Sequence, residues 1–159
     1  MNKYLDKVAE SLPYRLRSEV LIHKDGKVLL TVNPSESGVW HGLPGGGVEE
    51  GQTPEEAAIA ESLEEVGIKV KNLRDSGETQ VKEGYLARKG QEHRQTAYRG
   101  SKTHLFEADF DAHDASNLAE DAVKYAWMTP AEAHRVLSKR FKETGYSGHQ
   151  VKALEKYLK

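Results

Sequence analysis

The sequence of 159 residues contains no cysteine. This absence excludes disulfide bonds, thiolate metal ligands and a cysteine nucleophile, and it fits a reducing compartment. No stretch approaches the roughly 20 consecutive apolar residues of a membrane-spanning helix. Residues 1–12 also lack an apolar run of signal-peptide length. We therefore expect a cytoplasmic protein with no membrane partner.

An excess of charge of one sign is missing as well. The 23 lysines and arginines nearly balance the 25 aspartates and glutamates, so the formal net charge is -2. This balance gives no reason to expect bulk binding to nucleic acid. The seven histidines contain no HxxxH-type pair, which argues against a zinc site.

Length and composition favour a single domain. Chains of this length usually form one domain, and 37% hydrophobic with 30% charged residues is typical of a polar globular protein. No repeat, low-complexity tract or linker divides the sequence. We predict one domain over residues 1–159, with an N-terminal extension at 1–13 and a C-terminal helix at 146–159.

Strand formers and turn residues predict the order of the elements. Two strand-forming segments, 14–23 and 27–32, flank Asp25-Gly26, which is a strong β-hairpin signal. We expect further strands at 68–73, 103–110 and 123–128, and helices at 2–12, 53–66, 129–139 and 149–158. Segment 33–38 has the composition of a loop, and segment 76–102 is polar with weak periodicity. The mixture predicts an α/β fold, a mixed sheet with helices on its faces.

The helix after Thr53 has clear end signals. Thr53 can cap it, Pro54 suits its first position, and Glu56 completes a capping box. Gly67 suits the position after its end. At 100° per residue, we expect one face to pack on the sheet and the opposite face to border a cleft. The packing face contains Ile59, Leu63 and Val66, and the cleft face contains Ala57, Ala58, Glu61, Glu64 and Glu65.

The glutamates of this helix form an unusual patch. Glu61, Glu64 and Glu65 share one face, because residues three and four apart are neighbours on a helix. Their repulsion destabilises a helix by a few tenths of a kcal/mol per pair. A hard divalent cation, which prefers oxygen ligands, would relieve it. The nearby glycines at 45–47 let backbone approach a ligand, so the pattern predicts a Mg²⁺ site that handles phosphates.

The stretch Gly46–Ile68 resembles the Nudix box, G-x5-E-x7-R-E-U-x-E-E-x-G-U, in which U is a bulky aliphatic residue. The three glutamates and the glycines at 46 and 67 match. The flanking sequences GVWHGLPGG and YAWMTPAEA also look like family members. Three positions depart, because Gln52, Ala60 and Ser62 replace a glutamate, an arginine and an aliphatic residue. Loss of the acidic and the basic residue together leaves no orphan charge, so we expect a modified but working site.

The resemblance implies an α/β/α sandwich that cleaves a nucleoside diphosphate linked to another moiety, with Mg²⁺ or Mn²⁺. It assigns the metal to Glu61, Glu64 and Glu65, with the Gly46 carbonyl as a further ligand. The same three glutamates are the catalytic residues, and Glu61 is our first choice for the base that takes the proton of water. In some family members the base lies on a later loop, where Glu120 or Asp121 would serve.

Substrate contacts are predicted from charge. Segment 76–102 carries six basic residues among tyrosines and histidines that can stack on a base. The proposed substrate-binding residues are Arg15, Arg17, Arg99, Lys102 and Asp121, and ordinary surface charge is the alternative for each. The substrate class includes nucleoside triphosphates, ADP-ribose-like compounds and dinucleoside polyphosphates. A non-catalytic nucleotide-binding or sensing module is the competing hypothesis. Many family members are dimers, so a homodimer is compatible with the resemblance.

Overall fold

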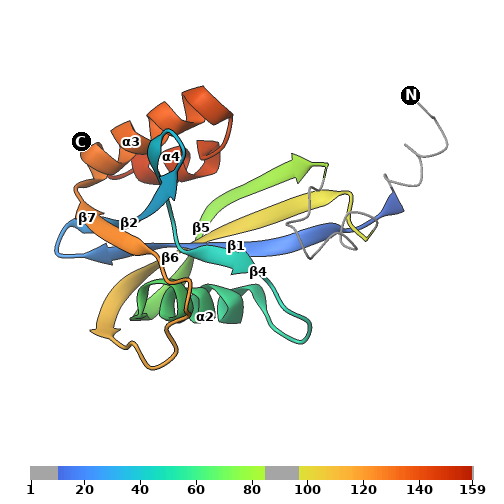
Figure 1. The fold of residues 1–159 in the computed structure, drawn as a ribbon, viewed down its shortest axis with the longest axis horizontal. Helices are drawn as coiled ribbons and strands as arrows, with labels where there is room; N and C mark the ends of the chain where they lie inside the picture. The colour runs from blue at the N-terminus through green and yellow to red at the C-terminus, as the bar shows by residue number, and fades with distance from the viewer. Residues whose placement is uncertain (1–10, 85–96, 159) are drawn as a thin grey trace.

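The computed structural model describes residues 11–84 and 97–158 (Figure 1). Along this part of the chain lie β1 (Tyr14–Lys24), β2 (Lys27–Ser35), β3 (Gly38–Gly42), β4 (Gly45–Gly47), α2 (Pro54–Val66), β5 (Ile68–Glu83), β6 (Gly100–His113), β7 (Lys124–Met128), α3 (Pro130–Thr144) and α4 (Gly148–Glu155). The helix predicted at 2–12 falls outside the described residues except for its last two positions. None of the helices described is long and apolar enough to cross a membrane.

The strands form one seven-stranded mixed sheet. Its order is β3-β2-β1-β6-β5, with β4 paired to β1 and β7 paired to β2. β1 and β6 are parallel, and the other pairs are antiparallel. Helix α2 covers one face of the sheet, while α3 and α4 cover the other (Figure 1). The predicted α/β fold with helices on both faces is confirmed.

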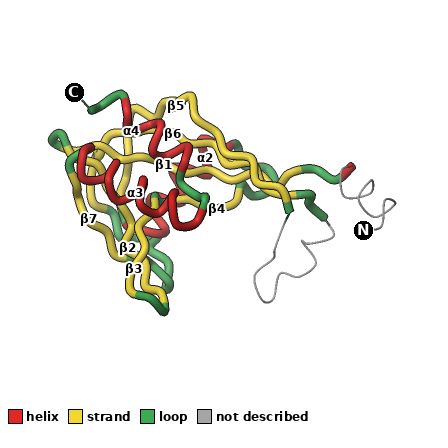
Figure 2. The backbone as a smooth tube through the Cα atoms, turned by 90° about the horizontal axis from the view of Figure 1, so that it is seen from above, coloured by secondary structure: helices red, strands yellow, loops and turns green. Residues whose placement is uncertain are grey.

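The hairpin between β1 and β2 forms as predicted. Asp25 and Gly26 have φ values of 51° and 76°, and two residues with positive φ are what a type I′ turn requires. The loop predicted at 33–38 is wrong in part, because β2 continues to Ser35 and pairs with β3. These two strands form a ribbon at the edge of the sheet, seen from above in Figure 2. An edge position tolerates Pro34, which has no N–H to donate.

β5 is much longer than predicted. It extends from Ile68 to Glu83 rather than ending at residue 73, and it pairs with β6, which begins at Gly100. Three shifts in register interrupt this pairing between residues 69 and 78. The first shift adds one residue on β6, the second adds one on β5, and the third adds two on β5. Residues 76–83 are half-buried or exposed, so no alternation of apolar side chains marks this part of the strand in the sequence. The basic residues of 85–96 lie outside the described residues.

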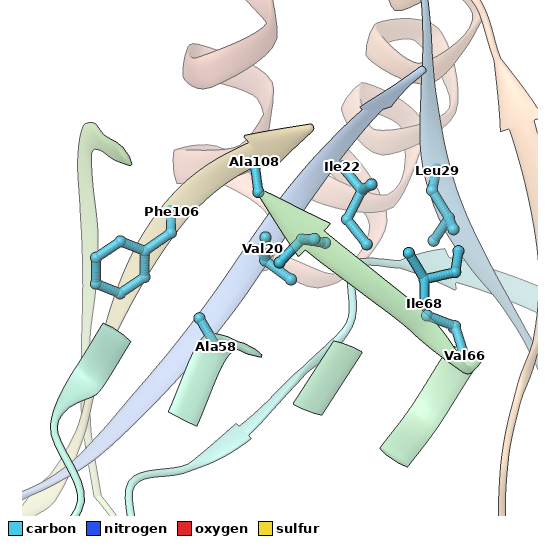
Figure 3. Close-up of a cluster of buried hydrophobic side chains, with 9 residues drawn as sticks. Val20, Ile22, Leu29, Ala58, Val66, Ile68, Phe106 and Ala108 are labelled. Atoms are coloured by element: carbon cyan, nitrogen blue, oxygen red, sulfur yellow. The ribbon is translucent and has the colours of Figure 1, made fainter. Parts of the chain in front are cut away.

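The alternation of side chains along β1 divides the core into two halves. Val20 and Ile22 point toward α2, where they pack with Ala58, Ile68 and Phe106 (Figure 3). The intervening Leu21 points toward α3 and α4, in a cluster that also contains Leu30, Leu105, Leu137 and Leu154. A strand buried on both faces has no polar side, and it provides a rigid base from which neighbouring side chains project.

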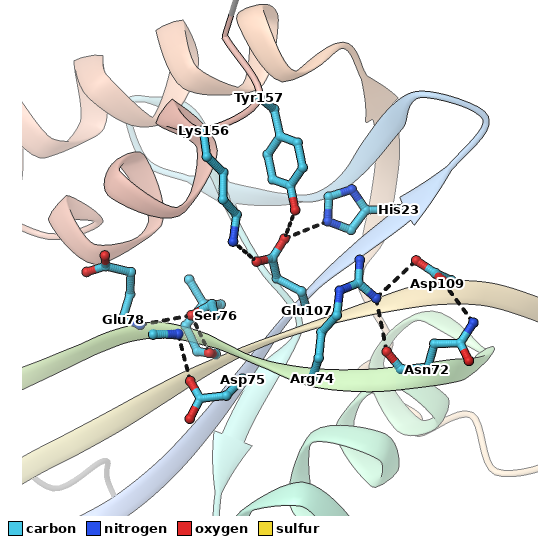
Figure 4. A network of polar contacts seen from close by, with 12 residues as sticks. His23, Asn72, Arg74, Asp75, Ser76, Glu78, Glu107, Asp109, Lys156 and Tyr157 are labelled. Atoms are coloured by element: carbon cyan, nitrogen blue, oxygen red, sulfur yellow. Dashed lines mark hydrogen bonds and ion pairs between the residues drawn. The ribbon is translucent and has the colours of Figure 1, made fainter.

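A buried carboxylate fixes the C-terminal end to the sheet. Glu107 of β6 is 1% exposed and is contacted by His23, Lys156 and Tyr157 (Figure 4). The distance from His23 Nε2 to Glu107 Oε1 is 2.8 Å. Burial alone would raise the pKa of Glu107, but the hydrogen bonds from these three partners lower it to about 2. The carboxylate is therefore ionised at neutral pH.

Candidate active site

Helix α2 begins and ends where its sequence predicts. The amide of Glu56 donates to Thr53 Oγ1, and the amide of Thr53 donates to Glu56 Oε1, each at 3.1 Å. This capping box supplies partners for amides that have no acceptor within the helix. Gly67 ends the helix with a φ of 65°, a conformation that glycine adopts without strain.

The face of α2 that packs on the sheet is only partly the one predicted, since Val66 is buried as expected but Ile59 is not. Ala57 and Ala58 are buried rather than facing a cleft, whereas Ile59 is 38% exposed. Small side chains let the helix backbone come close to β1, where Ser18 Oγ donates to the Pro54 carbonyl at 2.7 Å. The close packing of helix on strand therefore stabilises the fold more than burial of Ile59 on this face would. As a result Glu61 and Glu65 are half-buried at the boundary between helix and sheet.

Ser62, which replaces an aliphatic residue, is part of the same contact. Its side chain is fully buried, and Ser62 Oγ donates to the Ile68 carbonyl at 2.7 Å. A buried hydroxyl is tolerated when it is hydrogen-bonded. The substitution therefore links the end of α2 to the start of β5.

The three glycines of β4 bring backbone against the carboxylates. The Gly45 amide donates to Glu65 Oε2 at 3.3 Å. A Cβ on Gly46 would lie 2.3 Å from Glu61 Oε1, and one on Gly47 would lie 2.0 Å from Arg15 Nη2. A side chain at either position would displace the end of Glu61 or of Arg15 from its present place. The glycines thus permit Glu61 and Arg15 to approach the strand from its two sides.

The carboxylates are held in an environment that disfavours their charge. Burial, followed by the charge of Glu64, raises the pKa of Glu61. Burial, followed by the charge of Glu61, raises the pKa of Glu65 to about 7. The positive charge of Arg17 opposes both shifts, and the negative charge of Asp121 adds to both. The patch carries more negative charge than its surroundings neutralise.

The loop after β6 brings Asp121 to this patch. The backbone amides of two loop residues, Ala119 and Val123, donate to the backbone carbonyls of Glu64 and Glu65, at 2.8 and 3.0 Å. Last-turn carbonyls of a helix lack partners within it, so the loop supplies them and is fixed there. Asp121 itself is exposed, within electrostatic reach of Glu61 and Glu65.

The donors available here suit a hard divalent cation. In the described ranges, no three acidic, histidine or cysteine side chains already converge as a metal cage. Mg²⁺ does not need such a cage, because it is commonly held by one or two carboxylates together with substrate phosphates and water. Two half-buried carboxylates with raised pKa values match that chemistry. The oxygen donors at this site are therefore of the type that Mg²⁺ prefers.

The predicted basic contacts separate into two groups. Arg15 and Arg17 project from β1 on one face, beside β4. Lys102 is the partner of Leu16 across β1 and β6, so strand alternation places it on the opposite face. Arg99 forms an ion pair with Glu83, Nη2 to Oε1 at 3.2 Å, away from β4. The structure brings only Arg15 and Arg17 to the glycines.

A family comparison agrees with this geometry. The model of the NUDIX domain matches residues 14–151. The chain belongs to the Nudix family. Membership supports a hydrolase that acts on phosphoric anhydrides.

Solved structures show the same fold at low sequence identity. A NUDIX hydrolase from Nitrosomonas europaea is 17% identical, with a TM-score of 0.57, over 86% of this chain and 90% of that one. The E. coli ORF135 protein is 20% identical, with a TM-score of 0.58, over 92% and 89%. An ADP compounds hydrolase is 16% identical, with a TM-score of 0.60, over 91% and 71%. These similarities establish the Nudix fold for this chain.

Gln52 occupies the first glutamate position of the Nudix box without joining the carboxylates. The side-chain Oε1 of Gln52 accepts a hydrogen bond from the backbone amide of Glu49 at 3.0 Å. The backbone amide of Gln52 donates to the backbone carbonyl of Glu49, also at 3.0 Å. The side chain therefore closes the turn before α2. This turn also carries Glu49, whose negative charge contributes to the raised pKa of Glu61.

A second polar cluster behind Gly45 was not predicted from the sequence of this Nudix protein. Glu19 lies on β1, where a Cβ on Gly45 would be 2.8 Å from its Cγ. His149 Nε2 lies 2.5 Å from Glu19 Oε1, and Gln150 Nε2 donates to both Glu19 oxygens at 3.2 Å. The only signal was a lone glutamate in the otherwise apolar run SEVLI. Its partners are some 130 residues away in the sequence.

Proposed function

We propose that this Nudix protein is a pyrophosphohydrolase dependent on Mg²⁺ or Mn²⁺. Its substrate would be a nucleoside diphosphate linked to another moiety, cleaved by attack of water on phosphorus. The observation that carries this proposal is the pair of half-buried carboxylates, Glu61 and Glu65, held against the glycines of β4. A fold does not by itself determine function, whereas a negatively charged, partly dehydrated patch beside two arginines suits a metal–phosphate complex.

The chain's own residues would divide the chemistry between them. Glu61, Glu64, Glu65 and the Gly46 carbonyl would hold the metal ion, which when bound neutralises phosphate charge and acidifies water. Glu61 is the proposed base, since burial gives its carboxylate a raised pKa and hence a greater affinity for a proton. Asp121 and Glu120 on the docked loop are the alternative bases.

Arg15 is the proposed phosphate contact. Its guanidinium lies directly over Gly47, as the 2.0 Å separation from a virtual Cβ indicates. A guanidinium binds phosphate oxygens with two parallel hydrogen bonds, and glycine leaves space for those oxygens against the backbone. The substrate charge would then be shared between the metal on one side and Arg15 on the other.

Three substrate classes fit this site: nucleoside triphosphates, ADP-ribose-like compounds and dinucleoside polyphosphates. All three contain the phosphoric anhydride that the site would cleave. The resemblance in fold to a protein titled ADP compounds hydrolase supports including adenine diphosphate derivatives among them. A homodimer and a cytoplasmic location remain predictions.

A screen for product release with Mg²⁺ tests the proposal directly. The purified protein is incubated with a nucleotide panel, and the products are identified by chromatography. Glu64→Gln and Glu65→Gln should each abolish metal-dependent hydrolysis while the fold, followed by circular dichroism, is retained. Glu55→Gln is the matched control, because Glu55 is an exposed glutamate in the first turn of the same helix. Full activity in both site variants would refute the assignment.

A non-catalytic nucleotide sensor is the second candidate. It is favoured by one observation, the absence of the acidic and basic residues of the box at Gln52 and Ala60. The two candidates differ in turnover rather than in binding. A nucleotide that raises the unfolding temperature with Mg²⁺ but yields no product would support the sensor.

A further inference from the structure

Helix α4 is fixed to β1 through the carboxylate of Glu19, whose side chain is 17% exposed. Glu19 and Leu21 alternate along β1 onto the same face of the sheet, the face that α3 and α4 cover (Figure 1). His149 Nε2 lies 2.5 Å from Glu19 Oε1, and the side-chain amide of Gln150 donates to both Glu19 oxygens at 3.2 Å. The first turn of α4 thus holds this carboxylate in one place.

The side chain of Glu19 lies directly against the backbone of Gly45. The two residues are Cα partners on β1 and β4, and a Cβ on Gly45 would lie 2.8 Å from Glu19 Cγ. Glu19 therefore contacts the first glycine of β4 from the face of the sheet that is opposite to α2.

The backbone amide of Gly45 points away from β1, toward Glu65. The Val20 amide donates to the Pro44 carbonyl at 3.0 Å, and hydrogen-bonded pairs alternate with non-bonded pairs along an antiparallel ladder. The pair of Glu19 and Gly45 is therefore a non-bonded one, and the Gly45 amide does not donate to β1. It donates to Glu65 Oε2 at 3.3 Å. One peptide unit thus lies between Glu19 and a carboxylate of the candidate active site.

Helix α4 also supports this segment by apolar packing. Leu43, two residues before Gly45, is 8% exposed and belongs to the same core cluster as Ala153 and Leu154 of α4. The segment that carries the Gly45 amide is therefore held from α4 at two points, by the Leu43 side chain and by Glu19.

The polar contact between α4 and β1 is costly for the fold. His149 Nδ1 and Gln150 Oε1 are buried, and neither has a hydrogen-bond partner among the residues that the structure describes. Buried polar atoms without partners are destabilising, and native proteins rarely retain them without a reason. A role in the active site provides such a reason.

We propose that Glu19, held by His149 and Gln150, is a positioning residue for Glu65. Glu19 fixes Gly45, and the Gly45 amide then orients the Glu65 carboxylate. Partners of this kind orient the ligands of many metal sites. This inference rests on the proposed function, in which Glu65 is a metal ligand. It makes α4 a support of the metal site from the opposite face of the sheet.

Two substitutions of similar size test this role. Glu19→Gln places an amide nitrogen where a carboxylate oxygen accepts hydrogen bonds, and His149→Phe keeps a ring but loses the donor. In each variant kcat should fall about tenfold to a hundredfold, as is usual when a group that orients a metal ligand is lost. KM should stay within about twofold, because neither residue contacts the substrate. His149→Gln retains a donor and should keep part of kcat.

Tyr157→Phe is the matched control. Tyr157 contacts Glu107 and anchors the chain beyond the other end of α4. Glu107 lies on β6, whereas β4 is paired with β1. The control should therefore lower the free energy of unfolding, measured in urea, while kcat stays at the wild-type value.

Two readouts do not depend on turnover. Hydrogen exchange of the Gly45 amide, followed by NMR in the metal-free protein, reports its hydrogen bond to Glu65. Exchange should be about tenfold faster in Glu19→Gln and His149→Phe, and binding of Mn²⁺ to the nucleotide-free protein should be about tenfold weaker. Tyr157→Phe should match the wild type in both measurements.

Wild-type kcat, Mn²⁺ affinity and Gly45 exchange in Glu19→Gln and His149→Phe would overturn the proposal, as would equal losses in Tyr157→Phe. Faster Gly45 exchange with unchanged kcat and Mn²⁺ affinity would also overturn it, because Gly45 would then not orient a metal ligand. If Glu19→Gln does not fold, the two His149 variants carry the same test. If the wild-type protein hydrolyses no nucleotide, the proposed function fails, while the exchange and Mn²⁺ measurements still test Glu19.

Discussion

The metal-free protein should lose stability as the pH rises through neutrality, because of Glu65. Burial and the neighbouring Glu61 raise the pKa of Glu65 to about 7 from an ordinary value of 4.5. The folded state therefore binds this proton more tightly than the unfolded state does. The resulting stability is fully present below pH 4.5 and is lost as the pH rises through 7.

The size of this effect follows from the two pKa values. One pKa unit corresponds to about 1.4 kcal/mol, so the difference between 4.5 and about 7 amounts to about 3 kcal/mol. Glu65 is only half-buried, so solvent screening makes this an upper limit. Native domains have a total stability of about 5–15 kcal/mol. The predicted change is a substantial part of that range.

Urea unfolding in EDTA between pH 5 and 8.5 measures this dependence. Glu65→Gln should remove most of the decrease in the free energy of unfolding with rising pH, and it should be more stable than the wild type at pH 8. Titration of Glu61 should account for the decrease that remains. Glu64→Gln is the control, since Glu64 is exposed, and it should largely keep the wild-type slope. Mg²⁺ at a hundredfold excess over its Kd should add about 2.7 kcal/mol to the wild type and much less to Glu65→Gln. A wild-type profile that is flat, or a slope unchanged in Glu65→Gln, would refute the reasoning.

Three further predictions concern the support of the site and the fold. Gly46→Ala should abolish hydrolysis, because its Cβ would lie 2.3 Å from Glu61 Oε1; activity near the wild-type level would contradict this. Ser62→Ala should lower the free energy of unfolding by about 1–3 kcal/mol, since the buried Ile68 carbonyl loses its donor, and urea unfolding checks it. Glu107→Gln should make the free energy of unfolding less dependent on pH in acid. In the wild-type protein, the lowered pKa of Glu107, about 2, contributes stability that is present above pH 4.5 and is lost as the pH falls toward 2. Equal acid sensitivity in both proteins would show that another group is responsible.

The elements that the sequence predicted well are those specified by neighbouring residues. Thr53, Pro54 and Glu56 start α2, and Gly67 ends it, at the predicted positions. Asp25-Gly26 likewise forms the predicted turn. Caps and turns depend on φ and on hydrogen bonds within a few residues, so their information is local. The match of Glu61, Glu64 and Glu65 to the Nudix box is local in the same sense.

Predictions that needed a partner distant in the sequence were the ones that failed or were missed. Periodicity predicted Ile59, Leu63 and Val66 on the packing face of α2. Val66 is buried there, but Ala58 and Ser62 take the place of Ile59. Periodicity also gave no sign of the second half of β5, because none of its side chains from residue 76 onward is buried. Helix-to-sheet distance and strand register are properties of the assembled structure rather than of a segment.

The sequence by itself determined the helix that carries the glutamates, the turn of the first hairpin and the family. Tertiary structure alone decided which environment those glutamates meet. It half-buries Glu61 and Glu65 against the glycines of β4, and it pairs those glycines with residues 17–19 of β1, more than forty residues before the glutamates. The physical reason is that caps and turns are satisfied within a few residues, whereas dehydration and charge compensation depend on every segment that packs around the group.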